Sequence, residues 1–93
     1  MIVGVMMLEL LIHESGSLKR KRQVLRSLKD RLKNNFNISV AEVGGHDKWQ
    51  RADLGIAYVG IDKQTVNSTL DKVLNFVEDV HDLQLTNYEM EII

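Results

Sequence analysis

Four consecutive cations, Lys19-Arg20-Lys21-Arg22, are the residues whose types and spacing best suit a chemical role. If they begin a helix, its dipole is positive there, and each exposed cation costs a few tenths to about 1 kcal/mol. Acids four residues further on do not compensate the first three, because Gln23, Val24 and Leu25 occupy those positions. Uncompensated cations on an accessible helix suit a contact with the phosphates of a nucleic acid.

The cations continue as a stripe along the predicted helix. With about 100° of rotation per residue, one side of the helix carries Arg22, Arg26, Lys29 and Lys33. A solvated helix face that aids solubility explains the same pattern equally well. Both interpretations therefore stay open at the level of the sequence.

Lys21 points elsewhere, into the apolar arc of the same helix. Its neighbours in that arc are Leu25, Leu28 and Leu32. A lysine in such a position either snorkels from the helix end to water or pairs with a carboxylate. Snorkelling is the commoner outcome and is the expectation here, with Glu14 and Glu42 as candidate partners for the alternative.

The stretch His46–Arg51 adds an aromatic residue and two cations. Trp49, with Lys48 and Arg51 beside it, could stack on a base or anchor a partner. A lone tryptophan next to a strand more often caps the hydrophobic core. We keep Trp49 and Arg51 as candidate nucleic-acid contacts beside that interpretation.

No motif indicates catalysis, a cofactor or a metal. His13, His46 and His81 fall in three predicted loops, without the close spacing that presets a metal site. Ser17 is explained as a helix cap, and no nucleophile elbow, Walker loop or G-x-G-x-x-G is present. We therefore expect no enzyme, no cofactor and no bound metal.

Hydrophobic periodicity predicts six elements in the order β-α-β-β-α-β. The strands are expected at Ile2–Ile12, Ile38–Val43, Ala52–Ile61 and Leu83–Ile92, and the helices from Leu18 to about Phe36 and after a cap at Asp62. Right-handed crossovers then favour an α+β, ferredoxin-like split β-α-β fold: a four-stranded antiparallel sheet of order 4-1-3-2 with two helices on one face. Residues 1–93 are expected to form a single domain. This topology brings the predicted loops that carry the three histidines and Trp49 to one edge.

Composition limits the locations and the kinds of partner that the sequence suggests. The formal net charge of −1 hides eight Lys and Arg against one acid between residues 19 and 33, and two against seven between residues 62 and 93. The absence of cysteine excludes disulfides and suits a reducing cytoplasm, which is the expected location. The apolar run Ile2–Ile12 contains Glu9 and lacks a basic leader, so a strand is expected there and not a signal peptide or membrane anchor.

The first strand is apolar on both faces, although the helices would cover only one. Val3, Val5, Met7 and Leu11 are expected to line the uncovered face or, if the two faces are reversed, Ile2, Met6, Leu8, Leu10 and Ile12. An exposed apolar sheet face indicates a partner, and a second copy of the chain is the simplest one.

Three segments make the sequence similar to a known family. Ser17-Leu18-Lys19-x-Lys21-Arg22, Asn37-x-Ser39-Val40-Ala41-Glu42-Val43 and Trp49-Gln50-Arg51-Ala52-x-Leu54-Gly55 resemble the YlxP-like family of small uncharacterised bacterial proteins. The resemblance implies a ferredoxin-like fold and, from the translation-related genes that tend to neighbour the family, an RNA or ribosome context. It implies no catalytic residues. Arg20 departs from the family pattern, in which an acid is expected between the two lysines.

Two functional hypotheses follow. The first is an RNA- or ribosome-associated binding module whose contacts are Lys19, Arg20, Arg22, Arg26, Lys29, Lys33, Trp49 and Arg51. The alternative is a homo-oligomeric regulatory domain that binds a small anionic ligand through residues such as Lys21 or Arg51.

Overall fold

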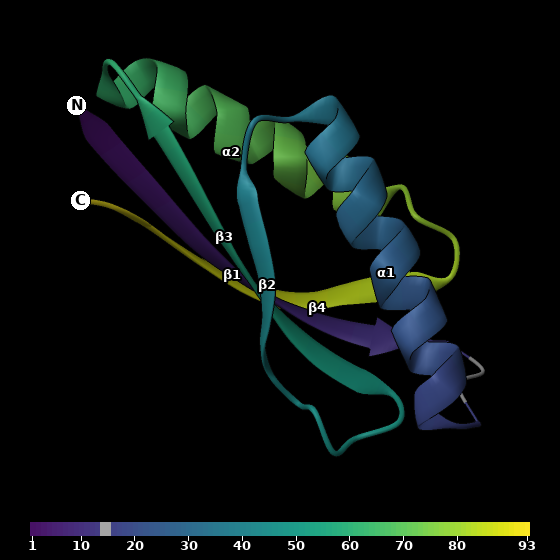
Figure 1. Ribbon diagram of the computed structural model, residues 1–93. Coiled ribbons are helices and arrows are strands. Elements are labelled where there is room, and N and C mark those ends of the chain that lie inside the picture. Colours follow the sequence, from purple (N-terminus) through teal and green to yellow (C-terminus); the bar gives the residue numbers. More distant parts are fainter. Residues whose placement is uncertain (14–15) are drawn as a thin grey trace.

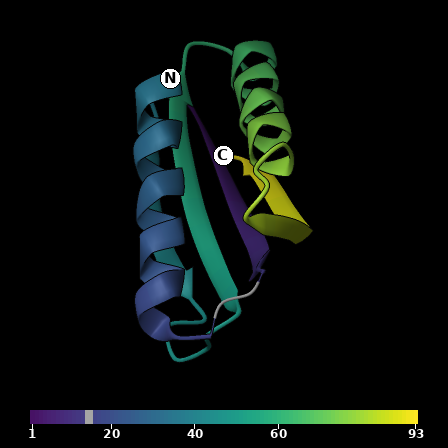
Figure 2. The same ribbon diagram turned by 90° about the vertical axis from the view of Figure 1, so that its right-hand side faces the viewer.

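A four-stranded sheet with two helices on one face makes up the computed structural model, which describes residues 1–13 and 16–93 (Figure 1). In chain order the elements are β1 (Ile2–Ile12), α1 (Leu18–Asn35), β2 (Ser39–Gly44), β3 (Arg51–Gly60), α2 (Lys63–Glu78) and β4 (Leu83–Ile92). The strands lie in the order β2-β3-β1-β4, and every neighbouring pair is antiparallel. This confirms the predicted order 4-1-3-2, read from the opposite edge. Figure 2 shows the two helices side by side in front of the sheet.

Both helices begin at the polar residue that the sequence predicted as their cap. Ser17 Oγ accepts a hydrogen bond from the Arg20 amide at 3.2 Å, and Asp62 Oδ1 accepts one from the Thr65 amide at 2.7 Å. Each cap satisfies a backbone donor that a helix start leaves unpaired. The bond from the Thr65 amide, with a further bond from its side chain, lowers the pKa of Asp62 below its ordinary value. Within the described residues, neither helix is long and apolar enough to cross a membrane.

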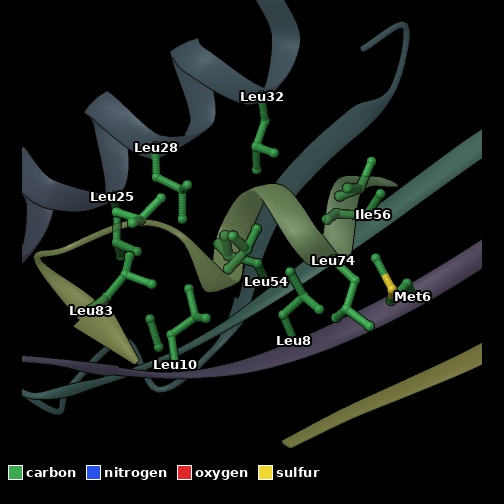
Figure 3. Packing of buried hydrophobic residues seen from close by; sticks show 14 of the residues in the cluster. Met6, Leu8, Leu10, Leu25, Leu28, Leu32, Leu54, Ile56, Leu74 and Leu83 are labelled. Atoms are coloured by element: carbon green, nitrogen blue, oxygen red, sulfur yellow. The ribbon is translucent and has the colours of Figure 1, made fainter. Parts of the chain in front are cut away.

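The core lies between the sheet and the helices. On the sheet side it is formed by every second residue of the two central strands, among them Met6, Leu8 and Leu10 on β1 and Leu54 and Ile56 on β3. Figure 3 shows Leu25, Leu28 and Leu32 of α1 pointing onto this layer. Because α1 packs on β2 while α2 packs on β1, β3 and β4, the first helix lies toward the β2 edge of the sheet.

The opposite face of the sheet has no covering layer among the described residues. The intervening residues of β1, namely Val3, Val5, Met7 and Leu11, point there and are partly exposed. The alternation along the strand separated the residues of the two faces correctly, and the structure decides which face is uncovered: it is the one that carries Val3, Val5 and Met7.

Gly45 closes the β2–β3 hairpin in a conformation that other residues adopt with strain. Its φ is 76°, and a Cβ there would lie 2.9 Å from the Arg51 carbonyl oxygen. We expect Gly45→Ala to lower the free energy of unfolding by about 1–2 kcal/mol, measured by urea denaturation. Gly16→Ala is the control, because a Cβ at Gly16 meets no atom of the described residues within 4 Å, its chain neighbours apart. Equal losses in the two variants would contradict the strain at Gly45.

Candidate nucleic-acid interface

A buried lysine ties the β2–β3 hairpin to α1. The Nζ atom of Lys21 donates hydrogen bonds to the carbonyl oxygens of Gly45 at 2.6 Å and Lys48 at 2.7 Å, and lies 3.4 Å from Glu42 Oε2. The Lys21 side chain is only 2% exposed. The expected snorkelling is therefore wrong, because the hairpin folds over the ammonium group before it reaches water. The alternative, a carboxylate partner, is realised with Glu42, while Glu14 lies outside the described residues.

These contacts occupy most of the hydrogen-bonding capacity of Lys21. An ammonium group has three donors; two of them bind the carbonyl oxygens of Gly45 and Lys48, and the positive charge faces the Glu42 carboxylate. Glu42 Oε2 is itself buried and accepts no hydrogen bond from the described residues, so the ion pair with Lys21 is its polar contact. Lys21 thus holds the hairpin, and its buried charge is already paired with Glu42 inside the protein.

Five cations form a continuous stripe on the outer flank of α1, which we call the α1 cationic stripe. It consists of Lys19, Arg22, Arg26, Lys29 and Lys33, successive members being three or four residues apart. None of them has a described carboxylate within 4.0 Å, not even Arg26 with Asp30 one turn away. The stripe runs about 21 Å along the helix axis, at 1.5 Å per residue. It is a run of positive charge with no internal neutralisation.

The first turns of this stripe enclose a shallow hollow. Lys19, Arg22, Gln23 and Arg26 line a depression of about 220 Å³. Lys19 therefore joins the stripe that the helical wheel assigned to four other cations. The signal for it was present in the sequence, because Lys19 precedes Arg22 by three residues.

The remaining arginines of α1 lie on its other flank, toward α2. Arg31 lies over the ring of Phe76, with 5.4 Å from its Cζ to the ring centroid. Arg20 Nη2 lies 4.0 Å from Asp82 Oδ1, just before β4. The structure consequently places Arg20 apart from the stripe, although it is adjacent in sequence.

Trp49 and Arg51 lie on the hairpin and at the start of β3, but in different surroundings. Trp49 is 56% exposed, so the expectation that it caps the core is wrong. Arg51 points to the uncovered sheet face, where its Nη2 lies 3.0 Å from Glu9 Oε1 and its Nε lies 3.5 Å from Asp53 Oδ1. Trp49 remains available for a partner, whereas Arg51 is ion-paired on the face away from α1.

The topology correctly predicted which loops share an edge. The Ile12 amide donates to the Gln50 carbonyl at 2.6 Å, and the His13 amide donates to the Asp82 carbonyl at 3.1 Å. The histidines on this edge, His13, His46 and His81, are exposed. In residues 1–13 and 16–93, no three His, Asp or Glu side chains form a group that could hold a metal ion.

Comparison with known proteins agrees with the resemblance noted in the three sequence segments. The family model described as "Protein of unknown function (DUF503)" matches residues 3–90. The chain is also 36% identical over 85 residues to the "Uncharacterized protein YlxP" of Bacillus subtilis (strain 168), an alignment that covers 91% of this chain and 92% of the relative. The chain therefore belongs to the DUF503 family, the family of YlxP.

Proposed function

We propose that this protein is a cytoplasmic RNA-binding module, acting on RNA or on the ribosome, that contacts phosphates through the α1 cationic stripe. The observation that carries the proposal is the stripe itself: five cations along about 21 Å with no described acid within 4.0 Å. Like charges one helical turn apart repel by about 0.2–0.5 kcal/mol per pair. A phosphate backbone beside them replaces that repulsion by attraction and releases its counterions.

The uncovered sheet face does not suit RNA. RNA-recognition modules stack bases on aromatic side chains of their central strands, but β1 has none and Tyr58 of β3 lies on the helix side, packed against the core. Acids also populate this face, including Glu9 and Asp53. Their charge would repel phosphates, so the helix side is the surface left for RNA.

Trp49 supplies a second type of contact near the stripe. It lies in the hairpin whose Gly45 and Lys48 carbonyls bind Lys21, close to the first turns of α1. A base stacked on an exposed aromatic side chain contributes about 1–3 kcal/mol in single-stranded complexes. Trp49 with the stripe would therefore combine stacking with phosphate contacts.

The test is the salt dependence of binding to a short single-stranded RNA of mixed sequence, followed by fluorescence anisotropy between about 50 and 200 mM salt. Each phosphate contact contributes about 0.7–0.9 to the slope of log affinity against log salt. Changing Arg22, Arg26, Lys29 and Lys33 together to Gln is therefore expected to reduce the magnitude of the slope by about three. Stability should be unchanged or slightly raised, because repulsion is relieved.

A control variant must exclude a general effect of the lower net charge, so it removes the same number of charges elsewhere. Arg26→Gln with Lys33→Gln removes two charges from the stripe, whereas Lys63→Gln with Lys72→Gln removes two from exposed positions on α2. Only the first pair should reduce the slope, by about 1.5. A slope unchanged in the quadruple variant, or equal effects of the two pairs, would disprove the proposal.

A further inference from the structure

The uncovered sheet face is a groove with an apolar floor, and the size of its side chains increases from β2 and β3 to β1. It encloses about 700 Å³ between β2 and β4. Ala41, Gly55 and Ala57, on β2 and β3, make the floor low, whereas Val5 and Met7 rise from β1 beside them. Glu89 and Glu91 of β4 form an acidic rim.

The cross-strand register orders these residues into rows. One row runs Ala41, Gly55, Met7, Glu89, and the next runs Ser39, Ala57, Val5, Glu91. Each row therefore passes from small through large to acidic, in the strand order β2-β3-β1-β4. Val43 and Val59, each 56% exposed, and Met7, 38% exposed, extend the apolar surface.

The face is large enough for an interface between two copies. Three strands of 10 or 11 residues and β2 with 6 residues, about 4.8 Å apart and at about 3.3 Å per residue, span roughly 600 Å². Two such faces would bury about 1,200 Å² together, the lower limit of stable specific interfaces. A second copy is thus a sufficient occupant.

The geometry points to a homodimer formed by these two faces, with its two-fold axis in the plane between the sheets and parallel to the strands. This axis stacks β3 of one copy on β1 of the other, so that Met7 and Val5 of each copy lie over Gly55 and Ala57 of the other. Large side chains then fill the low floor in a self-complementary way, as an isologous interface requires.

An axis perpendicular to the strands would do the opposite. It would stack β1 on β1 and β3 on β3, which sets Met7 against Met7 and leaves Gly55 over Gly55. It would also stack β4 on β4 and bring the acids Glu89 and Glu91 of both copies together. The shape of the sheet face and the position of its acids therefore both favour the axis parallel to the strands.

With the parallel axis, the acidic rim of one copy meets neutral residues on the uncovered face of β2 in the other. Glu89 and Glu91 lie over Ala41 and Ser39 of β2, the edge of the sheet nearest the α1 cationic stripe. At one end, however, Glu9 and Asp53 of both copies gather around two Arg51 side chains. Salt screens this excess of negative charge, so the dimer should tighten as salt rises, whereas RNA binding should weaken.

The natural sequence has no cysteine, which makes cysteine crosslinking specific to introduced sites. An equimolar mixture of the Ala41→Cys and Glu89→Cys variants, treated with a short bis-maleimide, should give a crosslinked dimer containing one chain of each. Either variant alone should give little. Crosslinking of Glu89→Cys alone would instead indicate β4 on β4 and overturn the proposed symmetry.

Light scattering or sedimentation equilibrium tests the interface itself. Wild-type protein should be a dimer at high micromolar concentration, and Met7→Lys should shift its dissociation constant upward by at least tenfold. Tyr88→Lys is the control, because Tyr88 is exposed on β4 but pairs with Leu8 on the helix side. A wild-type chain that remains monomeric, or a dimer that Met7→Lys leaves intact, would overturn the inference.

Discussion

Replacing Lys21 by methionine is expected to lower the free energy of unfolding by about 3 kcal/mol. Methionine retains the apolar stem of the side chain but removes the donors that meet the Gly45 and Lys48 carbonyls and the charge that faces Glu42. Two backbone acceptors and a largely buried carboxylate lose their partner together. For a domain of this size the melting temperature should fall by about 15 °C, measured by thermal circular dichroism.

The adjacent residue supplies the matched control. Arg22→Met makes the same change in charge on the same helix, but Arg22 is exposed and has no described carboxylate nearby, so a change within about 0.5 kcal/mol is expected. Adding Glu42→Gln to Lys21→Met should recover about 1 kcal/mol, because the unpaired carboxylate is gone while the two carbonyls remain unsatisfied. If Lys21→Met and Arg22→Met were equally harmless, the buried link would not contribute to stability.

The fold was predictable because its determinants are local. The alternation in β1 separated the residues of its two faces, and Ser17 and Asp62 marked the helix starts through bonds made within three residues. The strand bounds shifted by only one residue, as at β2, predicted from Ile38 and observed from Ser39. Once six elements were known, connection rules left one simple sheet order.

The site was less predictable because the surroundings of its side chains depend on how distant elements of the chain pack together. The sequence placed Lys21 in the apolar arc of its helix correctly but could not show that the hairpin would cover the ammonium group. Trp49 and Arg51 are two residues apart, yet Trp49 lies exposed in the hairpin and Arg51 points to the uncovered sheet face between Glu9 and Asp53. Arg20 likewise turns toward Asp82, whose position depends on how α2 leads into β4. The hydrophobic periodicity of the sequence does not specify the distances between these side chains and their partners.

Clusters of positive and of negative side chains lie on opposite layers of this molecule. The unpaired cations lie on the helix layer, and the acids of β1, β3 and β4 lie on the uncovered sheet face. A polyanion would be drawn to the first surface and repelled from the second. The two proposed contacts, with RNA and with a second copy, therefore occupy opposite sides of the domain and do not compete.

The helix layer itself depends on a glycine, and Gly4→Val is expected to lower the free energy of unfolding by about 2–3 kcal/mol. A Cβ at Gly4 would lie 2.5 Å from Val66 Cγ1 and 2.7 Å from Leu70 Cδ1, both of which are fully buried on α2. Glycine in a strand often marks such a close approach. Since α2 covers the central strands, valine here must push the helix off the sheet, which urea denaturation would detect.

Gly55→Val separates this clash from the general effect of valine in a strand. Gly55 pairs with Met7 on the uncovered face, and a Cβ there meets only the exposed side chain of Val43 closely, so at low protein concentration we expect no loss of stability. The clash can also be relieved by a smaller side chain on α2. In a double-mutant cycle of Gly4→Ala and Val66→Ala, the double variant should lose about 1 kcal/mol less stability than the two single variants together, because the smaller residue 66 makes room for the Cβ at position 4. Additive effects would mean that the contact between Gly4 and Val66 does not set the distance of α2 from the sheet.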